Sequence, residues 1–157
     1  MFVRTLLTST ALAASIAIAA PAFAGECPAG QMRADATKPV DYGPKAVTDM
    51  VLAQIDLSGE KIALNGHLMR VRKLEVQPGG IVPWHSHGDR PALIYVMSGE
   101  IYEHASNCTV PIVHKAGDVA SEKKGTSHWW QNTGTVPAVL ISVDLFPVES
   151  MKDQHMM

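Results

Sequence analysis

The sequence lacks an excess of basic residues, because 13 Lys and Arg stand against 15 Asp and Glu for a formal net charge of -2. That balance excludes the strongly basic surface expected of a nucleic-acid-binding protein. Gly-x-Gly-x-x-Gly and Gly-Lys-Ser/Thr motifs are also missing, so nothing indicates a nucleotide-binding site of those kinds. Charged residues make up only 18% and hydrophobic residues 46%, which argues against a disordered chain. The 157 residues therefore predict one ordinary domain.

No uninterrupted apolar run reaches the roughly 20 residues that a membrane-spanning helix needs. The nearest candidate, Ala11–Ala20, lies between the basic Arg4 and the small-x-small triplet Ala22-Phe23-Ala24. These three parts in this order are typical of a secretory signal peptide. We therefore expect cleavage of residues 1–24 after Ala24. The mature chain is expected to be periplasmic or secreted, with no membrane attachment.

Cysteine is scarce, with only Cys27 and Cys108 in the chain. Both lie in the expected mature part, and two lone cysteines in an oxidising compartment are most simply a disulfide. Closing a loop of this length would stabilise the fold by about 4–5 kcal/mol in the chain-entropy model. Two separate thiols are the alternative.

A convincing amphipathic helix is missing as well. From Val47 to Phe146 the chain consists of short strand candidates separated by turn signals such as Ser98-Gly99. Their even spacing predicts an all-β sandwich or barrel. We expect an extended N-terminal arm over residues 25–46, a barrel over residues 47–147 and a frayed tail over residues 148–157.

Two of the seven histidines, His85 and His87, are separated by one residue on a strand candidate. Alternate residues of a strand point to the same side, so both imidazoles face one way at a spacing that suits two ligands of one metal ion. The pair alone is weak evidence, since a solvated strand face would have the same pattern. His128 lies far along the chain and can join the pair only through the fold.

The residues around these histidines resemble the two motifs of the cupin superfamily, and more narrowly those of small, exported, single-domain bacterial cupins. The resemblance implies a double-stranded β-barrel, the cupin jelly roll, whose turns require glycine. It also implies that the three histidines bind a metal ion and that the motif asparagine is structural. The matching positions are Gly79, His85, His87 and Gly99 in the first motif and Gly117, Gly125, His128 and Asn132 in the second.

The chain departs from the first motif at position 92, where the resemblance places a glutamate ligand and the sequence has Ala92. We therefore expect a three-histidine site for one divalent ion (Fe, Zn, Cu, Ni or Mn), with coordination positions left open. Without a carboxylate the charge of the ion stays uncompensated, which favours small anionic ligands. Asp89, Glu100 and Glu103 are the nearby alternatives for a fourth ligand, although ordinary exposed charges are the base rate.

Three further residues are candidate catalytic groups. Arg90 could hold a substrate carboxylate in a bidentate pair, and Tyr95 could donate a proton. Trp130 has the same strand parity as His128 and could line the pocket. The ordinary alternatives are a surface arginine, a sheet tyrosine and a core tryptophan. At the C-terminus, His155-Met156-Met157 offers soft ligands suited to copper, against a tail with no role.

Two functions stay open. One is a metal-dependent enzyme, an oxygenase, isomerase or lyase that acts on a small anionic molecule; among cupins, three-histidine sites resemble those of thiol dioxygenases. The other is a non-catalytic cupin that senses, buffers or carries a metal or a small ligand. The open coordination site favours the enzyme. The expected partners are a small molecule and no nucleic acid, and a homodimer stays open.

Overall fold

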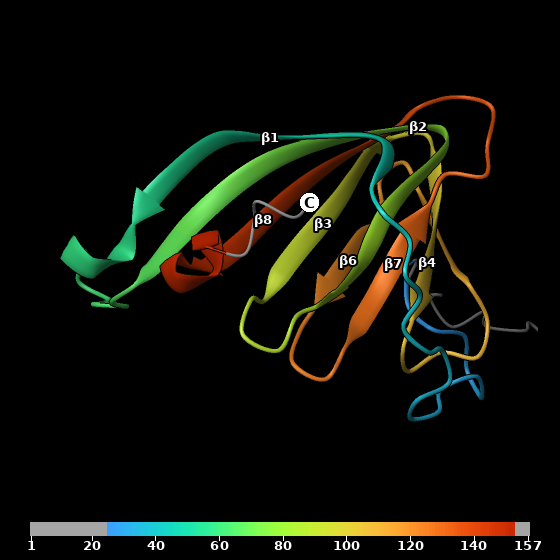
Figure 1. Cartoon of the computed structure of the whole chain (residues 1–157), viewed down its shortest axis with the longest axis horizontal. Coiled ribbons are helices and arrows are strands. Elements are labelled where there is room, and N and C mark those ends of the chain that lie inside the picture. The colour runs from blue at the N-terminus through green and yellow to red at the C-terminus, as the bar shows by residue number, and fades with distance from the viewer. Residues whose placement is uncertain (1–24, 153–157) are drawn as a thin grey trace, which may run out of the picture.

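The computed structural model describes residues 25–152, which fold into antiparallel strands arranged as two facing sheets (Figure 1). The predicted signal peptide and the His155-Met156-Met157 tail lie outside the described residues. Within residues 25–152, no helix is long and apolar enough to cross a membrane. The strands are β1 (Lys45–Asp56), β2 (His67–Ser86), β3 (Ala92–Ser98), β4 (Glu100–Ala105), β5 (Ile112–Lys115), β6 (Val119–Glu122), β7 (Ser127–Gln131) and β8 (Ala138–Pro147), with 3-10 helices η1 (Leu57–Gly59) and η2 (Val148–Lys152).

Strand β2 belongs to both sheets. Its first half pairs with β1 on one side and β8 on the other, and its second half pairs with β7. The eight strands thus form one continuous hydrogen-bonded sheet that folds over at β2, and its two facing halves, the first and second sheet, run β1-β2-β8-β3-β6 and β2-β7-β4-β5. The sequence predicts two strands here, interrupted at Pro78-Gly79-Gly80, whereas the structure has one strand that passes through this point. A Cβ at Gly80 would lie 2.7 Å from the Gln77 carbonyl oxygen, so a side chain has no room there.

The core lies between the two sheets. Alternate residues of β2, β3 and β8 point inward, which is the period-2 pattern of a half-buried strand. Inward side chains such as Val76, Val96 and Leu140 are buried, and Trp130 of β7 packs with them. This burial stabilises the fold through the hydrophobic effect. The predicted all-β, double-stranded barrel is confirmed.

The outward face of the first sheet is unusually apolar. Leu93 and Met97 are each 52% exposed, and they lie on the same strand as Tyr95 at 44%. Met69 of β2 and Val143 of β8 extend the surface across the neighbouring strands. The barrel thus presents one apolar sheet face to its surroundings.

The N-terminal arm is tied down by the predicted disulfide, which is present between Cys27 and Cys108 with their Cα atoms 5.7 Å apart. The arm (blue to cyan in Figure 1) runs alongside the sheet that contains β7 and β4. Met32 forms a β-bridge with Cys108, and Thr37 donates a hydrogen bond to the Cys108 carbonyl oxygen at 3.1 Å. The arm is therefore extended, as expected, and held at the turn after β4.

Candidate metal centre

The barrel interior brings the three predicted histidines together and adds an unpredicted carboxylate. His85 is the last residue but one of β2 and is paired in register with His128 of β7. His87 follows β2, and Glu122 ends β6. Each of the four residues offers one donor atom, and these atoms lie within 4.8 Å of one another. Imidazole nitrogens with one carboxylate oxygen are a donor set that suits a divalent transition-metal ion.

Backbone carbonyl groups orient two of the imidazoles. His85 Nδ1 lies 2.9 Å from the Pro83 carbonyl oxygen, and His87 Nδ1 lies 2.7 Å from that of Arg90. A carbonyl oxygen can only accept a hydrogen bond, so both Nδ1 atoms carry the hydrogen and both Nε2 atoms keep a lone pair. This is the tautomer that a metal-binding histidine requires at Nε2.

The Glu103 carboxylate orients the third imidazole, that of His128. His128 Nδ1 donates to Glu103 Oε1 at 2.6 Å, and His114 Nε2 donates to Glu103 Oε2 at 2.8 Å. Burial of Glu103 opposes its ionisation, but the hydrogen bonds from the two imidazoles outweigh this and lower its pKa to about 2. Burial likewise opposes protonation of His128, but Glu103 and Glu122 raise the pKa of His128. Glu103 thus fixes the His128 ring from behind, as carboxylates do behind metal-binding histidines.

Three imidazole nitrogens and the Glu122 carboxylate face one another at the centre. His128 Nε2 lies 3.1 Å from His85 Nε2 and 3.3 Å from a Glu122 oxygen, and His87 Nε2 lies 2.9 Å from the other. His87 Nε2 is buried and has no hydrogen-bond partner. Burial, with the neighbouring His128, holds the pKa of His85 well below its usual value, which disfavours a proton there. A bound cation would satisfy all four acceptors.

Glu122 corrects the expectation of a site without a carboxylate. It is the direct cross-strand partner of Ala92 in the β3–β6 pair, so the carboxylate comes from the strand next to the position where the motif places it. The sequence alternatives lie elsewhere: Asp89 is exposed, and Glu100 forms a surface ion pair with Lys115 at 3.5 Å. Glu103 is close by, but it binds imidazole hydrogens.

Of the three candidate catalytic residues, two lie at the cavity beside the histidines and one does not. Trp130 is buried and lines the cavity beside the histidines, with its Nε1 3.4 Å from His128 Nε2. Arg90 lines the same cavity. Tyr95 has the opposite parity to Ile94 on β3 and lies on the outer sheet face, so it is no part of this site. The motif asparagine, Asn132, holds two backbone carbonyl oxygens, each at 2.8 Å, which is the structural role expected for it.

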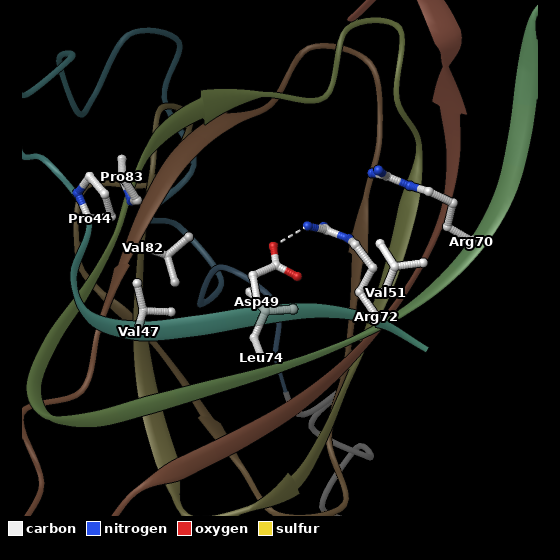
Figure 2. A pocket seen from close by; sticks show the side chains of 9 residues that line it. All are labelled: Pro44, Val47, Asp49, Val51, Arg70, Arg72, Leu74, Val82 and Pro83. Carbon is white, nitrogen blue, oxygen red and sulfur yellow. Dashed lines mark hydrogen bonds and ion pairs between the residues drawn. The ribbon is translucent and has the colours of Figure 1, made fainter. Parts of the chain in front are cut away.

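Two adjoining cavities, which share four lining residues, lie beside the donor cluster. An inner chamber of about 50 Å³ is lined by His85, Glu122, Trp130, Arg90 and Arg72, among others. An outer chamber of about 310 Å³ opens beyond it (Figure 2). Burial lowers the pKa of Arg90, and the neighbouring positive charge of Arg72 lowers it further. Arg72 belongs to no recognisable motif, and its only signal in the sequence is an inward parity on β2.

The chain is similar in sequence to plant proteins over about half of its length, and its residues 72–144 match the family model of the cupin domain. Nectarin-1 of Nicotiana langsdorffii x Nicotiana sanderae is 32% identical over 82 residues, covering 50% of this chain and 36% of that protein. Germin-like protein subfamily 2 member 1 of Arabidopsis thaliana is 29% identical over 82 residues, covering 50% and 37%. The chain thus spans little more than a third of the length of these curated relatives.

Solved structures share the fold. An uncharacterized conserved protein with a double-stranded beta-helix domain from Klebsiella pneumoniae is 25% identical, with a TM-score of 0.50 over 71% of this chain and 84% of that one. A protein from Thermus thermophilus is 19% identical, with a TM-score of 0.52 over 68% and 89%. The matched cupin domain and the double-stranded barrel agree: this chain belongs to the cupin superfamily.

Proposed function

We propose that this cupin binds one divalent metal ion through His85, His87, His128 and Glu122 and acts as a metal-dependent enzyme on a small anionic molecule. The observation that carries the proposal is the convergence of four potential ligand atoms, three imidazole nitrogens and one carboxylate oxygen, within 4.8 Å of one another. Fe, Zn, Cu, Ni and Mn all accept such donors, so the donor set does not choose among them. When bound, such an ion supplies a Lewis acid that polarises an oxygen atom of the substrate.

The residues around the cluster support an anionic substrate. Glu122 would compensate one unit of a bound ion's charge. The attraction of the site for an anionic substrate therefore depends mainly on the arginines. Arg72 and Arg90 line the inner chamber with the histidines. Trp130 and Ile94 supply apolar wall in the same chamber, and a partly apolar wall limits water beside the reacting groups.

A non-catalytic role in metal or ligand binding is the second candidate, and one observation favours it. Among the described residues that line the inner chamber, Asp49 is the only carboxylate outside the donor cluster, and it is bound to Arg72. An enzyme that moves protons needs a base within reach of its substrate. A protein that only buffers or carries a ligand does not.

Metal analysis of the purified mature protein tests the proposal first, with about one equivalent of a transition metal per chain expected. Oxygen consumption and product analysis with thiols, diketones and phenols would then separate the enzyme from the carrier. Metal content that is unchanged in a His85→Ala/His128→Ala double variant would contradict the site. Bound metal with no turnover of any anionic substrate class would favour the carrier.

Export and self-association form part of the same proposal. The Cys27–Cys108 disulfide supports an oxidising compartment, and N-terminal sequencing of the secreted fraction would test cleavage after Ala24. The apolar outer face around Leu93 and Met97 supports a homodimer. Light scattering of wild type against Leu93→Lys would test it, since the lysine should shift a dimer toward monomer.

A further inference from the structure

Three arginines share one buried carboxylate beside the donor cluster. Arg70 and Arg72 lie at alternate, inward positions of β2, and Arg90 follows the second histidine. Asp144 of β8 receives two hydrogen bonds from Arg70, at 3.0 and 2.7 Å. The same carboxylate lies 3.6 Å from Arg72 Nε and 3.9 Å from Arg90 Nε. One negative charge thus serves three positive charges inside the barrel.

A second carboxylate, Asp49, comes from the edge strand β1. Figure 2 shows the Asp49 carboxylate pointing across the cavity at the Arg72 guanidinium group, with which it forms an ion pair. The Asp49 side chain is 37% exposed, whereas that of Arg72 is 10% exposed. With Asp49 counted, the three arginines exceed these two carboxylates by one charge, and Glu122 of the donor cluster supplies the third negative charge beside Arg90. The nearly buried Arg72 side chain is therefore paired with a carboxylate, Asp49, that is accessible to solvent.

Arg72 is not fully satisfied by these contacts. Its Nη2 donates to Ser142 at 3.3 Å, but its Nε is sealed from solvent and has no hydrogen bond, since Asp144 at 3.6 Å is too far for one. A buried donor without a partner costs stability. A guanidinium group has the planar fork that binds a carboxylate at two points, and a one-point contact leaves that capacity unused.

The position of the Asp49–Arg72 pair connects this cluster to the metal site. Asp49, Arg72, Leu74 and Val82 line both the outer and the inner chamber. The Asp49–Arg72 pair therefore lies where the two chambers adjoin, next to the cavity that His85 lines. A carboxylate that reached Arg72 would compete with the Asp49 carboxylate, which contacts only Arg72 Nη1.

We propose that Arg72 and Arg90 form a carboxylate-binding subsite in which Asp49 is an internal substitute for the ligand. A small carboxylic acid with a second oxygen donor displaces Asp49 and places its carboxylate on Arg72. Its other oxygen reaches the donor cluster, a step that rests on the proposed function. Displacement breaks and forms only ion pairs and hydrogen bonds, with no covalent change. The substrate class is thus a short dicarboxylate or a hydroxy- or oxo-carboxylate.

Succinate binding to the metal-free mature protein tests the subsite, by calorimetry and by intrinsic tryptophan fluorescence. Arg72→Gln should weaken succinate binding at least about tenfold, because a buried charged partner is lost. Asp49→Asn should strengthen it about threefold, because a competing but half-exposed carboxylate is removed. Lys73→Gln is the matched control, since Lys73 is the next residue of β2 and pairs with Glu75 on the outer face. It should leave the affinity unchanged.

Equal succinate affinity in wild type and a folded Arg72→Gln variant would overturn the proposal. If Arg72→Gln fails to fold, Asp49→Asn decides alone, and an unchanged affinity in that variant overturns it. Inorganic phosphate binding more tightly than succinate would also overturn the assignment to carboxylates. Metal titration of the same proteins distinguishes failure of the carboxylate subsite from failure of the proposed metal site. A wild type that binds succinate but no metal refutes the proposed function and leaves the subsite standing.

Discussion

We predict that a substitution can supply the carboxylate of the donor cluster from β3 in place of β6. Glu122 of β6 and Ala92 of β3 are direct cross-strand partners, and both are buried, with 5% and 7% of their surface exposed. Directly opposite residues of an antiparallel pair have Cβ atoms about 4.5–5.5 Å apart. A glutamate at position 92 therefore starts within one side-chain length of the place that Glu122 occupies.

Glu122→Ala should lower metal affinity about 100-fold or more. The substitution removes the only carboxylate of the cluster, whose oxygens lie 2.9 and 3.3 Å from two imidazole nitrogens. One pair of unit charges 4 Å apart is worth about 4 kcal/mol at an effective dielectric constant of 20, and a divalent ion gains more. Loss of an outer-shell partner alone costs about 10–100-fold, so a direct ligand should exceed that.

The double variant Ala92→Glu/Glu122→Ala should recover at least about tenfold of the lost affinity. The matched control is Ser121→Glu/Glu122→Ala, in which the same charge enters one residue earlier on the exposed face of β6. Calorimetric titration with Zn²⁺ or Mn²⁺ measures all four proteins. If the folded double variant binds no better than this control, the assumed register of β3 against the metal site is wrong. If Glu122→Ala binds metal like wild type, Glu122 is not a ligand.

Three further results are expected. Metal occupancy should fall below about pH 6, because the imidazoles must be neutral to bind metal, and it should be lost in His85→Ala/His128→Ala at any pH; occupancy that persists at pH 4 in plasma-emission analysis would refute histidine ligation. In the metal-free protein, Glu103 has its pKa lowered from 4.5 to about 2, so its stabilisation of about 3 kcal/mol is present above pH 4.5 and lost as pH falls toward 2. Urea unfolding of Glu103→Gln should therefore show a weaker loss of stability over that range, and a slope equal to wild type would count against the Glu103 network. Reduction of the Cys27–Cys108 disulfide should lower the free energy of unfolding by up to about 4–5 kcal/mol, and an unchanged melting temperature after reduction would contradict a stabilising role.

Local patterns in the sequence predicted much of the fold. The strand parity of His85 and His87, the turn glycines and the two lone cysteines each depend on few neighbouring residues. Glycine at position 99 shows why: it has φ +79°, and a Cβ there would lie 2.6 Å from the Pro137 carbonyl oxygen. A steric demand of this kind leaves a mark in the sequence that can be recognised before the fold is known.

Features that depend on pairing between distant strands were not predicted. Glu122 reaches the site only because β6 pairs with β3 in a register that places it opposite Ala92, and nothing in linear spacing carries that information. Arg72 is recognisable only once Asp49 and Asp144 have been brought beside it. Tyr95 is a different case, since an inward Ala92 already implies an outward residue three positions later. That prediction was inconsistent with its own register.

Because β1 is an edge strand, its local opening should affect how easily a ligand reaches the arginine subsite. Among the described residues, β1 pairs with β2 alone, and most of its residues are exposed. Local opening of this strand would carry Asp49 away from Arg72, and edge strands open locally at a lower free energy than central ones. Backbone amides of β1 should therefore exchange with deuterium faster than those of β8, and a bound carboxylate should quicken them further by removing the Asp49 tether. Opening rates would then be tuned by substitutions on the outer side of β1, such as Met50, remote from any group that touches a ligand.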